Sequence, residues 1–345
     1  MSYFSATWAD ARDRFRAAVQ AHLHGHLEVL AGHTIDWALT GDPAATKLLV
    51  SSSGLHGVEG FPGSAVQLQL LANLPATAVL FLHVLNPWGM ANLRRFNEHN
   101  VDLNRNFLAP GVPYRSADPT FAEVDPLLNP PTPPPAFELF WPRVGWVVAR
   151  HGYQALKNAV VGGQHQNPHG LFYGGAELEP GPRALLALTD HQLAGRTRVV
   201  HVDWHSGLGA YGGRTLLLEG QNPDEKVARV RAVMGPDVKG WDDANKDAYE
   251  IRGGMLMALG RRHPGCRYDG LTCEFGTVPN LKVLAALRNE NRLHHWGTPT
   301  LDHPAKHALR EAFAPTDPAW QAAVLRHGGE VHALAERLLA APGSV

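Results

Sequence analysis

The sequence of 345 residues contains only two cysteines, Cys266 and Cys273. Two thiols are too few for a disulfide framework, and they cannot form a thiolate zinc site. Both cysteines are therefore expected to be ordinary buried thiols. A chain that depends on no disulfide suits a reducing compartment, so we expect a cytoplasmic location.

The sequence also lacks an excess of charge of one sign and long apolar runs. Its 31 Lys and Arg residues nearly balance its 32 Asp and Glu residues, and the two signs are interspersed. No basic face is therefore expected for nucleic acid or for an anionic membrane. No apolar run approaches the ~20 residues that span a bilayer. Residues 1–26 lack the apolar core of a signal peptide and have the spacing of an amphipathic helix.

What the sequence does contain is typical of a globular α/β protein. Apolar residues make up 44% of the chain and charged residues 18%. Buried strands are predicted at 46–52 and 78–85, with helical periodicity at 63–74 between them. Strand, helix and strand with short links are typical of a parallel sheet. Further strands are predicted at 34–39, 197–204, 214–219 and 270–276, and further helices at 137–160, 182–193, 226–234 and 254–261.

We expect one catalytic domain over residues 1–345. Residues 109–135 are rich in proline and are predicted to form a long surface loop. The C-terminal segment 280–345 is predicted to be helical, with separate helices at 281–290, 303–313, 318–326 and 331–339. Gly328 and Gly329 are interpreted as the stop between the last two.

A metal site is suggested by polar residues at the ends of the predicted strands. His56 and Glu59 follow the first buried strand, His205 follows another, and Glu274 closes a third. Because the carboxyl ends of parallel strands share one edge of a sheet, these four residues are expected to meet there. Two His and one Glu leave a fourth zinc position open, as catalytic zinc requires, and Glu274 can serve as the general base.

Three other patterns would suggest different sites or chemistries. His327 and Glu330 repeat the spacing of His56 and Glu59, but they follow no strand and are set aside. Residues 207–212 match the Gly-x-Gly-x-x-Gly dinucleotide pattern, yet a predicted strand follows where a nucleotide site needs a helix. The Gly-x-Ser-x-Gly elbow of serine hydrolases does not occur in the sequence.

The ordered set of motifs resembles the M14 zinc carboxypeptidases, and most closely their bacterial DUF2817 branch. The set comprises His56-Gly57-Val58-Glu59, Asn86-Pro87-x-Gly89, Asp102-Leu103-Asn104-Arg105-Asn106, His205 and Glu274. The resemblance implies a three-layer, phosphorylase/hydrolase-like α/β fold with a mixed, mostly parallel eight-stranded sheet flanked by helices. Trp88 departs from the family, which more often has Asp at this position.

The resemblance also implies a role for each site residue. His56, Glu59 and His205 would bind one Zn²⁺ per chain, and Glu274 would be the base and then the acid. The remaining roles are Asp102 as the carboxylate that orients His56, Asn104 and Arg105 as ligands of a substrate carboxylate, Arg94 or Arg95 as the group that polarises the scissile carbonyl, and Tyr249 as a substrate cap.

The sequence therefore predicts a zinc-dependent hydrolase that cleaves an amide bond next to a free carboxylate. Its expected partner is a small peptide or an acyl amino acid, and neither nucleic acid nor a membrane. Two alternatives stay open: an N-acyl-amino-acid deacylase of the aspartoacylase or succinylglutamate desuccinylase type, and a catalytically silent metal-dependent peptide binder.

Overall fold

The fold is that of a computed structural model, which describes residues 2–115, 119–135, 138, 140–152, 162–218, 224–240 and 252–341. These residues form a seven-stranded sheet in the order β1-β2-β4-β3-β5-β7-β6. The strands are β1 (Leu23–Leu30), β2 (His33–Thr40), β3 (Lys47–Ser53), β4 (Val79–His83), β5 (Arg198–Ser206), β6 (Arg214–Leu218) and β7 (Arg267–Phe275).

The four central strands β4, β3, β5 and β7 are parallel, whereas β1, β2 and β6 join through antiparallel pairs. All nine residues of β5 are buried, as expected for a central strand covered on both faces. The mixed, mostly parallel sheet is thus confirmed. The described residues contain seven strands rather than eight, although Lys239 makes a single parallel bridge to Leu217 of β6.

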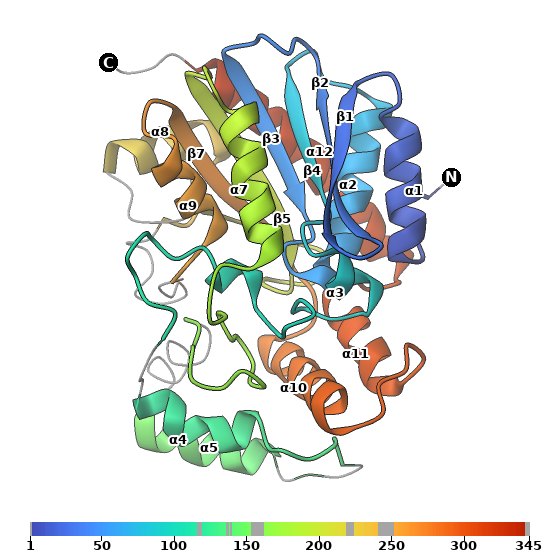
Figure 1. The fold of residues 1–345 in the computed structure, drawn as a ribbon, viewed down its shortest axis with the longest axis vertical. Helices are drawn as coiled ribbons and strands as arrows, with labels where there is room; N and C mark the ends of the chain where they lie inside the picture. Colours follow the sequence, from blue (N-terminus) through green and yellow to red (C-terminus); the bar gives the residue numbers. More distant parts are fainter. Residues whose placement is uncertain are drawn as a thin grey trace.

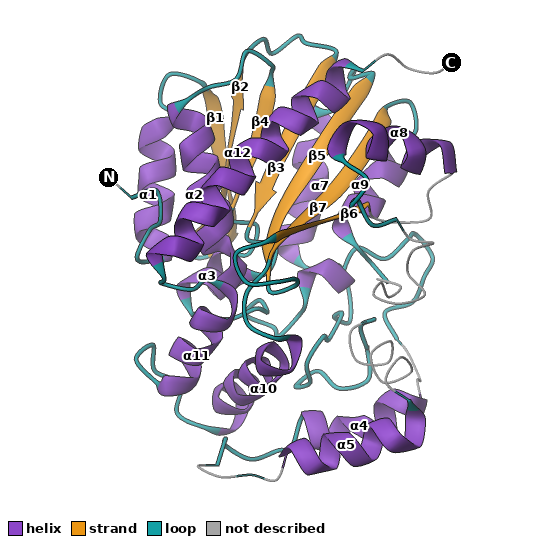
Figure 2. Cartoon of the chain, turned by 180° about the vertical axis from the view of Figure 1, so that it is seen from behind, coloured by secondary structure: helices purple, strands orange, loops and turns teal. Residues whose placement is uncertain are grey.

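Helices cover both faces of the sheet (Figures 1 and 2). One face packs against α1 (Trp8–Ala18), α2 (Gly60–Ala72), α8 (Asp224–Met234) and α12 (Pro318–Ala340). The other face packs against α7 (Pro180–Gln192) and α9 (Met255–Arg262). No helix of the described ranges combines the length and the apolar character needed to cross a membrane.

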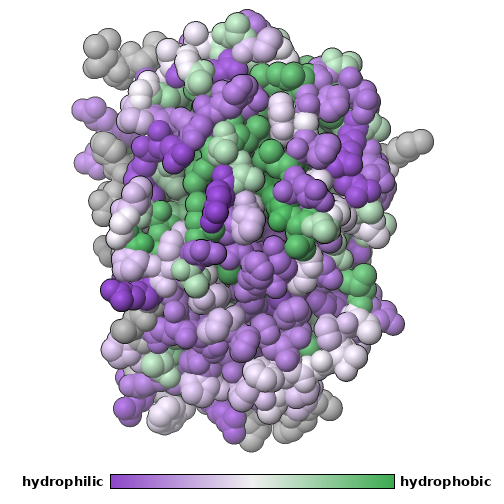
Figure 3. Space-filling model, viewed as in Figure 1, coloured by the Kyte–Doolittle hydropathy of each residue, from purple (hydrophilic) through white to green (hydrophobic). Residues whose placement is uncertain are grey.

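The remaining helices lie beyond the carboxyl ends of the parallel strands, in the lower half of Figure 1. They are α3 (Pro87–Ala91), α4 (Pro119–Leu128), α5 (Phe140–His151), α10 (Asn280–Trp296) and α11 (Pro304–Phe313). Side chains of α4, α10 and α11 form a separate apolar core there with Val58 and Phe96. On the face seen in Figure 3 the surface of this lower half is largely hydrophilic. His56, Glu59, His205 and Glu274 lie at or just beyond the carboxyl ends of β3, β5 and β7.

Of the predictions about the two ends of the chain, the N-terminal helix is confirmed over a shorter range and the C-terminal helix stop is wrong. The amphipathic helix predicted from the apolar spacing near the N-terminus is present as α1, with Trp8, Ala11 and Phe15 buried, but it ends at Ala18 and β1 begins at Leu23. Gly25 of β1 lies under the ring of Trp37, where a Cβ would come within 2.9 Å of the indole nitrogen. The C-terminal helix α12 is continuous through Gly328. A Cβ at this position would lie 2.6 Å from Val66 of α2, so the glycine allows the two helices to pack closely. Both glycines permit close packing and do not end an element.

The proline-rich segment 109–135 is also more ordered than predicted. It contains α4, which begins at Pro119, a residue type that suits the first turn of a helix. Phe121, Val124 and Leu128 are buried at helical spacing along it. Of the helix predicted at 137–160, α5 accounts for the part up to His151, and residues 153–160 lie outside the described part.

Candidate metal centre

The loop after β3 carries His56 and Glu59 beyond the carboxyl end of the sheet. Glu59 is the last residue of a short 3-10 turn that runs directly into α2. Gly57 is required in this turn, because a Cβ there would lie 2.2 Å from the backbone of Gly89 in α3. The glycine therefore lets the loop pack directly on α3.

The Asn86–Gly89 motif supports this loop from the next strand. Asn86 Oδ1 accepts a hydrogen bond from the Gly89 N–H at 2.9 Å, and its Nδ2 donates to the Arg95 carbonyl at 3.2 Å. The same carbonyl accepts from the Gly57 N–H at 3.1 Å. The motif thus ties the metal-site loop to the backbone of Arg95, which is an architectural role.

The structure brings His56, Glu59 and His205 together. His56 Nδ1 lies 2.9 Å from Glu59 Oε1, and His205 Nδ1 lies 2.9 Å from Glu59 Oε2. The two imidazole rings meet edge to face with centroids 4.8 Å apart, and none of the three residues is more than 3% exposed. Each offers a potential ligand atom within 4.8 Å of the others. This group is the candidate metal centre.

Glu274 lies beside this group on the neighbouring strand. In the parallel pair of β5 and β7, Glu274 is the register partner of His205. Its Oε2 is buried and has no hydrogen-bond partner within the described part of the chain. Burial, reinforced by the charge of Glu59, raises the pKa of Glu274 to about 8, against the opposing effect of His205 and Arg95. A carboxylate with a raised pKa is suited to general acid–base work near neutral pH.

Asp102 and Arg95 form the second layer around His56. His56 Nε2 lies 3.0 Å from Asp102 Oδ1, and Arg95 Nε donates to Asp102 Oδ2 at 3.1 Å. Arg95 also donates through Nη1 to Glu59 Oε1 at 2.8 Å. Burial alone would raise the pKa of Asp102, but the charges of Arg95 and His56 hold it well below its usual range.

One contact of Arg95 competes with this arrangement. Its Nη2 lies 2.8 Å from His56 Nε2, the nitrogen that also faces Asp102. A guanidinium can only donate, so Nε2 cannot accept from Arg95 while it donates to Asp102. We assign the proton to Nε2 and the hydrogen bond to Asp102, because this tautomer leaves Nδ1 able to bind a cation.

The donor set fits a zinc ion in chemistry and in charge. Two imidazole nitrogens and one carboxylate are the ligand types of catalytic zinc. His56 Nδ1 is buried and forms no hydrogen bond to any described residue, despite its proximity to Glu59. Burial would lower the pKa of His205, yet Asp203 and Glu59 raise it well above its usual value. Such a shift marks a position that favours positive charge.

Sequence reasoning missed Asp203, which contacts His205 from the side opposite Glu59. His205 Nε2 lies 2.6 Å from Asp203 Oδ2, and both residues are buried. Asp203 belongs to β5, which corresponds to the strand predicted at 197–204. The spacing Asp-x-His was the available signal, because residues two apart on a strand share a face.

Of the two predicted arginines, only Arg95 reaches the metal centre. Arg94 is fully buried on the other side of the turn, where its Nε donates to Glu290 Oε1 at 3.0 Å. Lys306 Nζ contacts the same carboxylate oxygen at 2.6 Å. Arg94 therefore belongs to a structural ion-pair cluster, in which its Nε donates to Glu290 and its Nη2 donates to the side-chain oxygens of Asn100 and Asn291.

The predicted carboxylate-binding residues lie just beyond Asp102. Arg105 is 1% exposed, and its Nη1 donates to the Asn104 carbonyl at 2.8 Å. Asn104 Oδ1 accepts from the Met255 N–H at the start of α9 at 3.0 Å. Electrostatically, Arg105 contributes to the lowered pKa of Asp102. Tyr249, the predicted cap, lies outside the described residues.

His327 and Glu330 do form a contact, at 3.0 Å on the surface of α12. Within the described ranges no third His, Cys, Asp or Glu joins them in a potential ligand group. The pair therefore remains a side-chain interaction along one helix.

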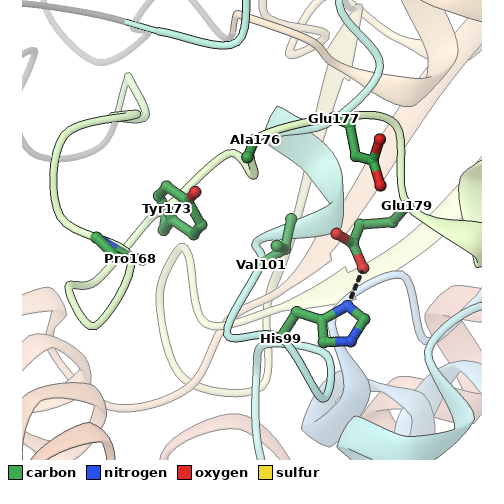
Figure 4. Close-up of a pocket in the computed structure, with 7 residues that line it drawn as sticks. All are labelled: His99, Val101, Pro168, Tyr173, Ala176, Glu177 and Glu179. Carbon is green, nitrogen blue, oxygen red and sulfur yellow. Dashed lines mark hydrogen bonds and ion pairs between the residues drawn. The ribbon is translucent and has the colours of Figure 1, made fainter.

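Two members of a second group of potential ligands, His99 and Glu179, line the pocket in Figure 4. Glu98, His99 and Glu179 offer ligand atoms within 4.8 Å of one another. Glu179 Oε2, however, already contacts Asn97 Nδ2 and His99 Nδ1, each at 2.7 Å. The hydrogen bond to Glu179 raises the pKa of His99. The pocket has a volume of about 370 Å³ and is lined by His99, Val101, Pro168, Tyr173, Ala176, Glu177 and Glu179. We interpret the His99–Glu179 contact as a structural ion pair in its wall.

The fold agrees with that of a solved carboxypeptidase A. Carboxypeptidase A from Helicoverpa armigera superposes with a TM-score of 0.50 at 13% identity, over 98% of this chain and 72% of that chain. Bovine thrombin-activatable fibrinolysis inhibitor, solved with tick carboxypeptidase inhibitor, gives a TM-score of 0.49 at 11% identity, over 98% and 99% of the two chains. A comparison with curated proteins returned no match.

At the level of sequence, one family profile covers most of the chain. The profile described as "Protein of unknown function (DUF2817)" matches residues 4–327. This match agrees with the resemblance inferred from the ordered motifs. The chain belongs to the DUF2817 family.

Proposed function

We propose that this chain is a zinc-dependent hydrolase that cleaves an amide bond next to a free carboxylate. The observation that carries the proposal is the buried group of His56, Glu59 and His205, with Glu274 in register beside it. Three ligands with an adjacent carboxylate of raised pKa are what zinc-assisted hydrolysis requires. The fold shared with a carboxypeptidase A is consistent with this chemistry.

A zinc ion held by the three ligands would supply a Lewis acid for the attacked carbonyl and would lower the pKa of water. Glu274 would accept the proton of the attacking water and pass it to the leaving amine nitrogen. Arg95, whose Nη1 contacts the ligand Glu59, is the guanidinium suited to donate to the developing oxyanion. Asp102 would keep His56 in the tautomer that presents Nδ1.

Asn104 and Arg105 are proposed to bind the free carboxylate of the substrate. A guanidinium can pair with a carboxylate through two parallel hydrogen bonds, which fixes the bond that reaches the metal. Gly163 packs against the methylene groups of Arg105, where a Cβ would lie 2.6 Å from Cδ. A larger side chain at position 163 would therefore displace the side chain of Arg105.

The proposal is tested with purified, zinc-loaded protein and two sets of substrates. One set consists of short peptides with a free C-terminal carboxylate and their amidated counterparts, and the other of N-acyl amino acids. We expect cleavage of at least one free-carboxylate substrate and its loss in Glu274→Gln. Preference for acyl amino acids would identify the deacylase alternative. A zinc-loaded wild type that binds these compounds and turns over none of them would be a peptide binder, which overturns the proposal.

A further inference from the structure

A row of polar side chains runs through the otherwise apolar interior of the sheet and ends at His205. His201, Asp203 and His205 occupy alternate positions of β5 and therefore point to one face. Ser52 of β3 is the register partner of Asp203. Tyr268 of β7 completes the row, and all five residues are buried.

The contacts in this row are short and continuous. Ser52 Oγ lies 2.5 Å from Asp203 Oδ1 and 2.7 Å from His201 Nε2. His201 Nδ1 lies 2.5 Å from the Tyr268 hydroxyl, and Asp203 Oδ2 lies 2.6 Å from His205 Nε2. Gly270 is the register partner of His201, and a Cβ there would lie 3.2 Å from the Tyr268 ring. The missing side chain leaves room for that ring beside His201.

The chemistry of the groups fixes the direction of every proton. The Asp203 carboxylate can only accept, so Ser52 must donate to it with its single hydroxyl proton. Ser52 then accepts from His201 Nε2–H, and the bare Nδ1 of His201 accepts from the Tyr268 hydroxyl. At the other end, His205 must donate to Asp203 from Nε2. Burial lowers the pKa of His201 to about 4, against the opposing charge of Asp203, which is consistent with a neutral ring carrying one proton.

We propose that Asp203, Ser52 and His201 are positioning residues that hold His205 with its proton on Nε2 and its Nδ1 directed at the metal. Asp203 acts on His205 directly, and Ser52 and His201 act through Asp203. The inference rests on the proposed zinc site. A purely structural role is a weaker explanation, because well-packed apolar side chains often stabilise a core as well as buried charges do.

Ser51 provides a matched control for Ser52. It is the preceding residue of β3, is also buried, and faces the opposite side of the sheet. Its hydroxyl accepts a hydrogen bond from Trp204 Nε1 at 2.9 Å. Ser51→Ala and Ser52→Ala therefore each remove one buried, hydrogen-bonded hydroxyl, but only Ser52 belongs to the row that reaches His205.

The experiment measures the zinc dissociation constant of purified apo protein by competition with a chromogenic chelator. Circular dichroism and thermal unfolding verify the fold of each variant. Asp203→Asn is expected to weaken zinc binding by roughly 10- to 100-fold, as is typical for partners of metal-bound His. Ser52→Ala should weaken it by about 3- to 10-fold, the effect of one hydrogen bond. Ser51→Ala should lower the melting temperature and leave the zinc dissociation constant unchanged.

Each other outcome has a distinct meaning. Wild-type zinc binding in Asp203→Asn, or equal weakening in Ser51→Ala and Ser52→Ala, would overturn the positioning role while the zinc site stands. If Asp203→Asn does not fold, the comparison of the two serine variants decides. A wild type that binds no zinc would overturn the proposed function and this inference with it.

Discussion

Replacing Glu274 with Gln should make the metal-free protein more stable and the enzyme inactive. The folded state raises the pKa of Glu274 from an ordinary value of 4.5 to about 8, chiefly through burial. The unfolded chain therefore releases this proton at lower pH than the folded chain does. As pH rises from 4.5 towards 8, the wild type loses the stability associated with the protonated group. Gln is neutral throughout and avoids this loss.

The expected gain in unfolding free energy of Glu274→Gln follows from the raised pKa of Glu274. Between pH 4.5 and pH 7 the stability that the wild type loses through Glu274 grows by about 1.36 kcal/mol for each pH unit, which gives roughly 3 kcal/mol at pH 7. The gain should be near zero at pH 4.5. A bound zinc ion favours the carboxylate, so loading with zinc should reduce the gain. Activity should fall by roughly 10²–10⁴, because the proton-transfer group is lost while the three ligands remain.

The assay is urea unfolding of both proteins in the presence of a chelator, at pH 5 and at pH 7.5, together with turnover of the zinc-loaded forms. A gain in unfolding free energy that is larger at the higher pH, combined with lost turnover, supports the assignment. A variant that is less stable than wild type at pH 7.5 would refute the reasoning on burial. A variant that retains turnover would show that Glu274 is not the base.

Three further predictions concern residues around the centre. Arg105→Ala should remove the preference for a substrate with a free carboxylate over its amidated counterpart, a difference in kcat/KM worth roughly 2–3 kcal/mol. If amidation lowers kcat/KM equally in the wild type and in the variant, Arg105 is structural. Glu290→Gln leaves Arg94 buried without its carboxylate partner and should lower the free energy of unfolding in urea by about 3–5 kcal/mol. A decrease below about 1 kcal/mol would contradict the ion-pair assignment. Nuclear magnetic resonance titration should find the pKa of His99 above its usual value and lowered in Glu179→Gln, because that carboxylate favours the protonated ring. The stability that this pair contributes should be present at low pH and lost as pH rises through the raised pKa of His99.

The residues of the candidate metal centre could be predicted from sequence because strand order alone brings them together. His56 and His205 lie about 150 residues apart in the chain, yet both are at the carboxyl ends of adjacent parallel strands. That inference needs only the strand assignments, which apolar runs reveal. The same logic separates His205 from His327, which lies within the helix α12 and follows no strand.

Other features depend on packing that sequence patterns do not encode. Arg94 and Arg95 are adjacent in an irregular turn, and no periodicity tells which side chain faces Glu59 and which faces Glu290. Gly328 was read as a helix stop because glycine usually weakens helices, whereas here it allows α12 to approach α2. The Asp-x-His spacing places Asp203 on the face of His205, but the contact of Asp203 with Ser52 of β3 depends on strand packing that no spacing reveals.

The central claim is tested most directly by the zinc content of three purified proteins, measured after exposure to excess zinc and removal of the unbound metal. We predict about one zinc per chain in wild type and in His327→Ala, and little in His205→Ala, because His205 supplies one of the three ligands. Equal zinc in the two variants, or none in wild type, would contradict the account.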